Sequence, residues 1–244
     1  MQAHLTAEEL VSLLQRSSLN TILVEGKDDM LIYRWIEERV GGGLANVLPC
    51  GGRDTLLEVY RRRAEIGHIK VLFIADQDTF VYTGVPPGTN EIIWTKGYSI
   101  ENDIYEGRGL EALLDNDERL EFRVALESFI QYYSKQYDAF TVGAEHEFGR
   151  HPSEVLDPHG RLKEPFATDI ATAPARPESI ERFRNGYELQ IRGKCLFALL
   201  IRLLSHSSRA AKHSYKSLCE TGVKITNPTS LERIVQECRV KLAA

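Results

Sequence analysis

The stretch that decides the fold is residues 21–29, Thr-Ile-Leu-Val-Glu-Gly-Lys-Asp-Asp. Four apolar or β-branched residues followed by a glutamate and a glycine are typical of a short buried strand that ends in a turn. Residues 29–40 then place apolar side chains at helical spacing, and Asp28 or Asp29 is available to cap that helix. Glu25 is therefore expected at the carboxyl end of a strand, where open α/β sheets bind ligands. On this stretch alone, Glu25 is equally well interpreted as a metal ligand or as a salt-bridge partner.

A second stretch of the same kind lies further along the chain. Residues 69–75 are nearly all apolar and end in Asp76-Gln77-Asp78. Aspartates two apart on an extended chain point to the same face, and like charges held so close repel each other unless a cation lies between them. A capping aspartate beside a solvated one would also explain a lone pair of this kind. Together with Glu25, the two aspartates predict a site for Mg²⁺ or Mn²⁺, which prefer oxygen ligands.

These stretches resemble the Toprim domain, a catalytic module shared by topoisomerases, bacterial primases, small ribosomal-RNA maturases and OLD-family nucleases. The resemblance rests on Val-Glu-Gly-Lys-Asp-Asp at 24–29 and Ile-Ala-Asp-Gln-Asp at 74–78, and it covers roughly residues 18–108. A further tract, residues 97–102 (GYSIEN), resembles Toprim effectors encoded beside ABC-type ATPases in bacterial anti-phage systems, the nuclease subunit of PARIS-type defence above all. The resemblance implies a metal-dependent nuclease.

The hypothesis for the site follows from both arguments. Glu25, Asp76 and Asp78 are expected to hold Mg²⁺ or Mn²⁺, with Glu101 helping to place a second ion. Glu101 belongs to the exit of a fourth strand expected at 91–95, and its neighbours Asn102 and Asp103 are also placed to join the carboxylate cluster.

A lysine in the second half of the chain completes this hypothesis. Gly193-Lys194, ahead of the apolar run 195–200, resembles a recurring element of the ATPase-linked effectors. The resemblance implies that Lys194 is the catalytic cation that stabilises the leaving oxygen. The alternative is that its stem only covers apolar surface.

The remaining elements predict an α/β fold: a Toprim-like, mostly parallel sheet with helices on both faces, followed by a helical region. Thr6 and Glu9 form a capping box for a first helix. Residues 46–50 predict a strand near an edge because they contain a proline. Residues 51–54, Gly-Gly-Arg-Asp, resemble a phosphate-binding turn but lack the full nucleotide-binding patterns, which favours a tight strand-to-helix turn. Residues 79–90 are expected to form a loop.

Two domains are expected, residues 1–108 for catalysis and residues 109–244 with helices. Helical spacing recurs over 110–137, 178–187, 189–205, 207–219 and 230–242. Residues 141–177 lose this periodicity and predict a long irregular loop, the kind of segment that is often functional.

Five basic side chains in the helical half are separated by four, three, four and three residues: Arg202, His206, Arg209, His213 and Lys216. On one continuous helix they would form a cationic stripe that contacts phosphates. Lys212 and Tyr215 lie close by and would add charge and stacking. A helix break near 205–208 would dissolve the stripe, and the sequence leaves both alternatives open.

The net charge of −5 hides an uneven distribution. Residues 1–175 carry 17 Lys and Arg against 29 Asp and Glu, whereas residues 176–244 carry 13 against 6. An acidic metal-binding half joined to a basic half suits an enzyme that acts on a polyanion. A helical surface that is basic for no functional reason is the alternative.

Several function classes are disfavoured by composition. No apolar run is long enough to span a membrane, and Met1 to His4 lack the basic-then-apolar pattern of a signal peptide. The four cysteines are scattered without metal-ligand spacing, which predicts reduced core residues in a cytoplasmic protein. The histidines of the irregular loop (His146, His151, His159) have no cysteine partner, so a zinc site is not expected.

The functional expectation is a toxic nuclease that cleaves RNA, tRNA included, or DNA and is restrained by an ABC-type ATPase partner, as the resemblance implies. A housekeeping RNA-maturation nuclease and a non-catalytic Toprim scaffold that binds an ATPase are the alternatives. The choice between RNA and DNA stays open, and so does a homodimer, the common state of small nucleases of this kind.

Overall fold

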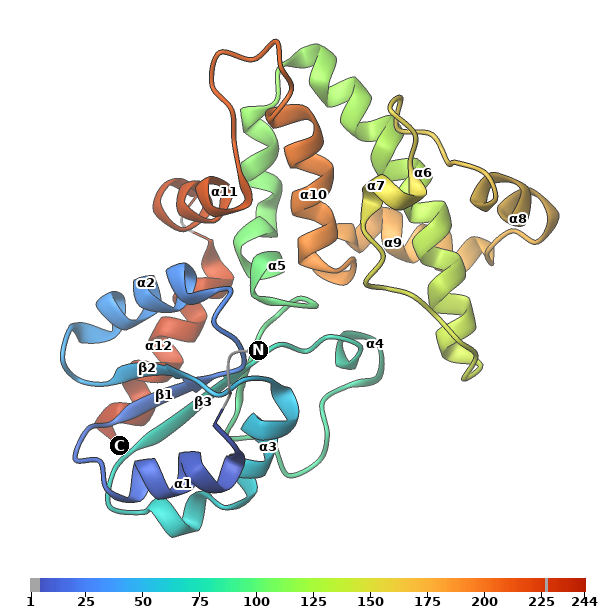
Figure 1. Cartoon of the computed structure of the whole chain (residues 1–244). Helices are drawn as coiled ribbons and strands as arrows, with labels where there is room; N and C mark the ends of the chain where they lie inside the picture. The colour runs from blue at the N-terminus through green and yellow to red at the C-terminus, as the bar shows by residue number, and fades with distance from the viewer. Residues whose placement is uncertain (1–4, 227) are drawn as a thin grey trace. The chain divides into compact units, whose positions relative to one another are not determined.

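The computed structural model describes residues 5–226 and 228–244 and shows an α/β protein with a helical C-terminal region (Figure 1). The expected fold class is confirmed. Residues 1–4, on which the expectation about a signal peptide rests, lie outside the described part. Packing divides the chain into two compact units, one formed by residues up to 104 together with 223–244, the other by residues 105–222.

The first unit is built on four parallel strands in the order β2-β1-β3-β4. The strands are β1 (Thr21–Val24), β2 (Asn46–Pro49), β3 (Val71–Ala75) and β4 (Ile93–Trp94). Val24 pairs with Pro49 on one side and with Ile74 on the other, so the ends of three strands lie level. β2 is an edge strand, as its proline predicts.

Helices cover both faces of this sheet (Figure 1). The helices of this unit are α1 (Ala7–Gln15), α2 (Met30–Gly41), α3 (Arg53–Arg61) with a 3₁₀ turn (Arg63–Ile66), α4 (Phe80–Thr83), α5 (Ile100–Tyr105) and α12 (Thr229–Ala243). α1 packs against α3, and α2 packs against α12. Leu23 and Phe73 join the core formed with α1 and α3, because alternate residues of a strand face opposite sides of a sheet.

The helix starts in this unit show which capping predictions hold. Thr6 and Glu9 form the expected capping box on α1. Asp29 occupies the N-cap position of α2, but its side chain makes no capping hydrogen bond there. The segment expected to be a loop after Asp78 contains the one-turn helix α4.

The C-terminal helix α12 returns the chain to the first unit. The Nζ of Lys70 donates to the Leu242 carbonyl at 2.6 Å, and Nη2 of Arg233 donates to the Trp94 carbonyl at 2.7 Å. The buried residues of α12 recur at helical spacing and give it an apolar face: Leu231, Ile234, Val235 and Cys238. This packing differs from the expected division at residue 108, which grouped residues 223–244 with the helical domain.

The second unit is helical. It contains a 3₁₀ segment (Glu106–Leu113) and α6 (Asn116–Thr141), α7 (Pro152–Val155), α8 (Phe166–Thr172), α9 (Pro177–Gln190), α10 (Gly193–Leu204) and α11 (Tyr215–Thr221). α6 packs along α9 and α10. The short helices α7 and α8 interrupt the segment expected to be irregular. Leu120 and Val124 are exposed on α6.

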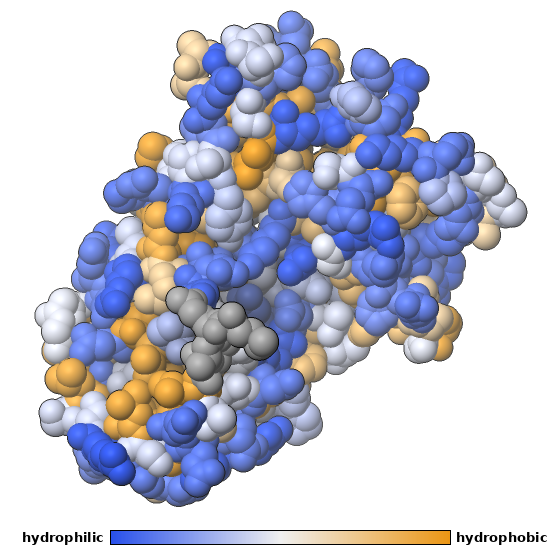
Figure 2. All heavy atoms as spheres, viewed as in Figure 1, coloured by the Kyte–Doolittle hydropathy of each residue, from blue (hydrophilic) through white to orange (hydrophobic). Residues whose placement is uncertain are grey.

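The surface is mostly hydrophilic on the face in view in Figure 2, and the four cysteines are buried. Figure 2 shows hydrophilic residues over most of the face in view. Cys50, Cys195, Cys219 and Cys238 are all free and buried, so the prediction of reduced core cysteines is confirmed. Among the described helices, none is both long enough and apolar enough to cross a membrane.

Candidate functional site

Glu25 and Asp76 meet at the carboxyl edge of the sheet. Glu25 directly follows β1 and Asp76 directly follows the neighbouring β3. Because parallel strands end at the same edge, the two residues lie side by side, and the N–H of Asp76 donates to Oε1 of Glu25 at 2.9 Å. The predicted juxtaposition of these two residues is thus confirmed.

The carboxyl group of Asp76 is enclosed by the start of α5. Its Oδ1 accepts a hydrogen bond of 2.9 Å from the N–H of Ile100, the first residue of that helix. Burial raises the pKa of Asp76 well above its usual value, and the negative charges of Glu25 and Glu101 raise it further. Burial also raises the pKa of Glu25, although the charge of Arg53 opposes this rise.

Glu101 is the third acid of this region. It lies on α5 and is fully buried, and its Oε2 accepts a hydrogen bond of 2.6 Å from the hydroxyl of Ser99. Its charge acts on Asp76, as the pKa of that residue shows. Glu25, Asp76 and Glu101 together form what we call the edge acids.

Asp78 lies in a different place from the one expected. Its φ of 45° is left-handed, so the chain has already left the extended conformation that would put Asp76 and Asp78 on one face. Its N–H donates to the Tyr98 carbonyl at 2.6 Å, and its carboxylate forms an ion pair with Arg53. The expectation that strand alternation aligns the two aspartates is therefore wrong.

The side chains of Asn102 and Asp103 form hydrogen bonds with the loop before α5. The expectation that they join the carboxylate cluster is not met by these contacts. The Asp103 carboxylate accepts hydrogen bonds from the N–H groups of Lys96 and Gly97, at 2.8 to 3.0 Å. Oδ1 of Asn102 accepts from the N–H of Ser99 at 3.0 Å. Both side chains are fully buried, and they hold the turn that leads from β4 into α5.

The edge acids fit a divalent ion in their chemistry. They offer carboxylate oxygens alone, the donors that Mg²⁺ and Mn²⁺ prefer, and their mutual repulsion favours a cation. Their arrangement is incomplete, because no three His, Cys, Asp or Glu side chains within residues 5–226 and 228–244 are grouped so as to hold a metal ion. Arg53 pairs with Asp78, and main-chain N–H groups bind one oxygen of Glu25 and one of Asp76.

Lys194 belongs to the second unit. It is the second residue of α10 and is half-buried. Its role as a catalytic cation stays a prediction.

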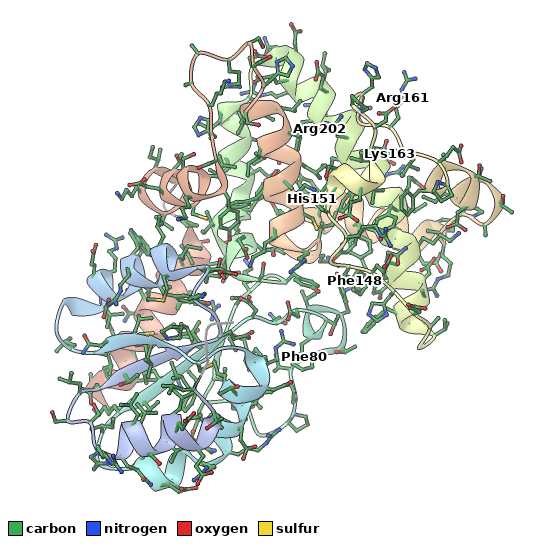
Figure 3. The ribbon with its side chains drawn as sticks, viewed as in Figure 1. Phe80, Phe148, His151, Arg161, Lys163 and Arg202 are labelled. Carbon is green, nitrogen blue, oxygen red and sulfur yellow. The ribbon has the colours of Figure 1, made fainter. Side chains whose placement is uncertain are left out.

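The expected cationic stripe does not form. α10 ends at Leu204 and α11 begins at Tyr215, so no continuous helix carries the five basic residues. The guanidinium of Arg202 donates to the Asp157 carbonyl in the segment between α7 and α8 (Figure 3). Arg209 pairs with Glu118 of α6. These two arginines are committed to contacts within the unit.

Lys212 and Lys216 are the lysines of the basic set, and both are exposed. Lys212 lies in the non-helical segment between α10 and α11, and Lys216 lies in the first turn of α11. Their role in nucleic-acid binding stays a prediction.

Two residues of the site region escaped the sequence argument. Arg53, the first residue of α3, contacts Glu25 and Asp78. Tyr33 of α2 is buried, and burial together with the charges of Asp76 and Asp29 raises its pKa well above the usual value. The signal for Arg53 was the Gly-Gly pair after β2, which marks a turn at the same edge; the helical pattern of α2 contains no signal for Tyr33.

In comparisons with known proteins, no protein-family model and no curated protein match this chain.

Proposed function

We propose that this chain is a metal-dependent phosphodiesterase that cleaves nucleic acid. The observation that carries the proposal is the contact between Glu25 and Asp76 at the ends of neighbouring parallel strands, with the buried Glu101 beside them. Carboxylates are costly to bury near one another, and a raised pKa at the ligand-binding edge of an α/β sheet marks a candidate functional site. The Toprim resemblance of the same residues supports the reaction class.

Each part of the site has a task in this proposal. The edge acids would hold the ion, and a bound divalent ion would supply a Lewis acid that neutralises charge on the phosphate oxygens. The N–H groups of Asp76 and Ile100 orient two of the carboxylates through their hydrogen bonds. The side chain of Glu25 is 17% exposed, so solvent reaches this edge of the sheet.

The biological setting in this proposal is anti-phage defence, with an ABC-type ATPase as the restraining partner. It rests on the resemblance of residues 97–102 to ATPase-linked effectors. In the structure this tract forms the turn into α5 that carries Glu101 and contacts Asp76, so it belongs to the same edge of the sheet.

The test is cleavage of labelled tRNA and of plasmid DNA by the purified full chain, with Mg²⁺ and then with EDTA. We expect cleavage of one substrate with Mg²⁺ and none with EDTA. Glu25→Gln should abolish it, whereas Glu91→Gln, an exposed acid of the same unit, should leave it unchanged. Cleavage in EDTA, or full activity of Glu25→Gln, would contradict the proposal.

A non-catalytic scaffold is the second candidate. It is favoured by the ion pair of Arg53 with Asp78 and by the lack of a grouped set of three ligands among the described residues. The same assay decides between the two, because a scaffold leaves both substrates intact under every condition.

A further inference from the structure

Arg53 is placed by the turn that follows β2. The N–H of Gly51 donates to the Glu25 carbonyl at 2.9 Å, so the turn continues the pairing of β2 with β1 beyond the strands. Gly52 has a φ of 140°, a conformation that side chains disfavour, and α3 begins at the next residue. Arg53 is thereby fixed beside Glu25 by main-chain geometry.

The guanidinium of Arg53 lies between two carboxylates. It forms an ion pair with Asp78, and its Nε lies 3.5 Å from Oε1 of Glu25. Its Cζ atom lies 5.3 Å from the centre of the ring of Phe80 on α4; Figure 3 labels Phe80. The side chain is 20% exposed, less than that of Asp78 at 38%. A cation therefore already occupies the space that the sequence assigned to metal ligands.

The arginine is only partly satisfied there. Its Nε is buried and, within the described residues, has no hydrogen-bond partner; Oε1 of Glu25, 3.5 Å away, is its ion-pair partner. A purely structural arginine usually satisfies its donors when it is buried, because an unpaired donor is costly. This one is held by charge and retains unused hydrogen-bonding capacity at the ligand-binding edge.

We propose that Arg53 is the phosphate-binding residue of the site, and that Glu25 and Asp78 hold it until a divalent ion takes over their charge; this inference rests on the proposed phosphodiesterase function. The planar guanidinium presents paired donors that match two oxygens of a phosphate. The ring of Phe80 supports the group while it changes partners.

Two consequences of opposite sign follow. A divalent ion at Glu25 competes with the guanidinium for the same negative charge, so Arg53 weakens ion binding in the free protein. Once substrate is bound, the same residue stabilises the phosphate, so Arg53 speeds hydrolysis. Loss of Arg53 therefore improves one property and damages the other, which no merely structural role would do.

The test uses the full chain with Arg53→Gln, which removes the charge, and Arg53→Lys, which keeps the charge but not the planar fork. Arg63→Gln is the matched control, since Arg63 lies in the same unit and pairs with Glu91 away from the edge acids. Binding of Mn²⁺ alone is measured by electron paramagnetic resonance. Hydrolysis of bis(para-nitrophenyl) phosphate is measured at saturating Mg²⁺, and circular dichroism checks folding.

We expect Arg53→Gln to bind Mn²⁺ about 10-fold more tightly, the scale on which neighbours of ligands alter metal affinity. Its rate of hydrolysis should fall about 100-fold. Arg53→Lys should bind Mn²⁺ as the wild type does and still lose hydrolysis, and Arg63→Gln should match the wild type in both assays. If Arg53→Gln fails to fold, Arg53→Lys decides through its hydrolysis.

The outcomes separate the two proposals. A wild type that binds Mn²⁺ and hydrolyses the diester, with an Arg53→Gln variant that equals it in either assay, overturns the role of Arg53 alone. Full hydrolysis by Arg53→Lys does the same. A wild type that neither binds Mn²⁺ nor hydrolyses the diester overturns the proposed function and this inference with it.

Discussion

The two compact units place their acidic side chains differently. In the first unit, Glu101 and Asp103 are fully buried and accept hydrogen bonds from a serine hydroxyl and from main-chain N–H groups. In the second, carboxylates of α6 pair with arginines at partly exposed positions: Glu118 with Arg209, Glu127 with Arg184, Asp138 with Arg176.

The difference shows where the protein buries carboxylates in spite of the free-energy cost of taking them out of water. An ion pair at the surface contributes little and costs little, so it needs no explanation beyond helix packing. A buried carboxylate costs on the order of several kcal/mol unless it is paired or hydrogen-bonded. Among the described residues, the fully buried acids Glu101 and Asp103 both belong to the first unit and lie near the edge of its sheet, which is where we place the proposed site.

The largest expected effect tests the division into units through the cysteines. Burial raises the pKa of Cys50 to about 11 and that of Cys238 to about 12, from an ordinary value of 9.0. The fraction of Cys238 present as the reactive thiolate at about pH 8 is thereby lowered roughly 1,000-fold. We expect Cys50 and Cys238 to resist a thiol reagent in the folded protein and to become reactive at the same urea concentration, as the first unit unfolds. Mass spectrometry measures the extent of modification at each cysteine. If Cys238 instead becomes reactive at the same urea concentration as Cys195 and Cys219, α12 does not unfold with the sheet, and its assignment to the first unit is contradicted.

The next effect tests the partly buried acid Asp76. Asp76→Asn should lower Mg²⁺-dependent cleavage by about 100-fold or more, because a charged group of the site is lost. The metal-free variant should be no less stable than the wild type, since asparagine still accepts the N–H of Ile100 and relieves the repulsion. Cleavage and urea unfolding are both measured. Asp117→Asn, an exposed acid of α6, is the control, and a clear loss of stability in Asp76→Asn would make that residue structural.

A smaller effect tests the ion pairs of the second unit. Arg209→Ala leaves Glu118 half-buried without its partner and should lower the free energy of unfolding by about 1–2 kcal/mol, less than for a fully buried pair. Arg184→Ala removes a more exposed partner and should cost at most about 0.5 kcal/mol. Urea denaturation gives both values. Equal losses would show that burial does not distinguish these pairs.

The smallest effect concerns nucleic-acid binding by the two exposed lysines. The double variant Lys212→Gln, Lys216→Gln should reduce the slope of log affinity against log salt by about 0.7 to 0.9 per lost phosphate contact. Filter binding of labelled tRNA across a salt series measures this slope, with Arg34→Gln of the first unit as control. Identical slopes would assign both lysines to a solvated surface.

The sheet and its edge were predictable because few alternatives satisfy the sequence. The apolar runs that became β1 and β3 are too short for buried helices and are bounded by acids and glycine, so strands were the consistent interpretation. Once the strands are parallel, Glu25 and Asp76 must share an edge, and their contact follows from topology alone.

The rest depended on backbone conformations that residue types do not determine. Asp78 adopts a left-handed conformation that aspartate tolerates without requiring it, so its turn toward Arg53 was not visible in the pattern. The helix end at Leu204 likewise lies in a run of serines that is compatible with both helix and loop, and the basic stripe depended on that choice. Tyr33 shows the same limit, because an aromatic residue on an apolar helix face does not reveal which charges lie near it.

The return of α12 to the sheet has a consequence for synthesis of the chain. Domains generally fold in order from the N-terminus as they leave the ribosome. Here the strands and edge acids emerge first, yet the helix that packs on α2 emerges only after residues 105–222. The helical unit is therefore complete in sequence before the sheet unit is. The sheet unit, which carries the edge acids, therefore finishes packing only after residues 223–244 have been made.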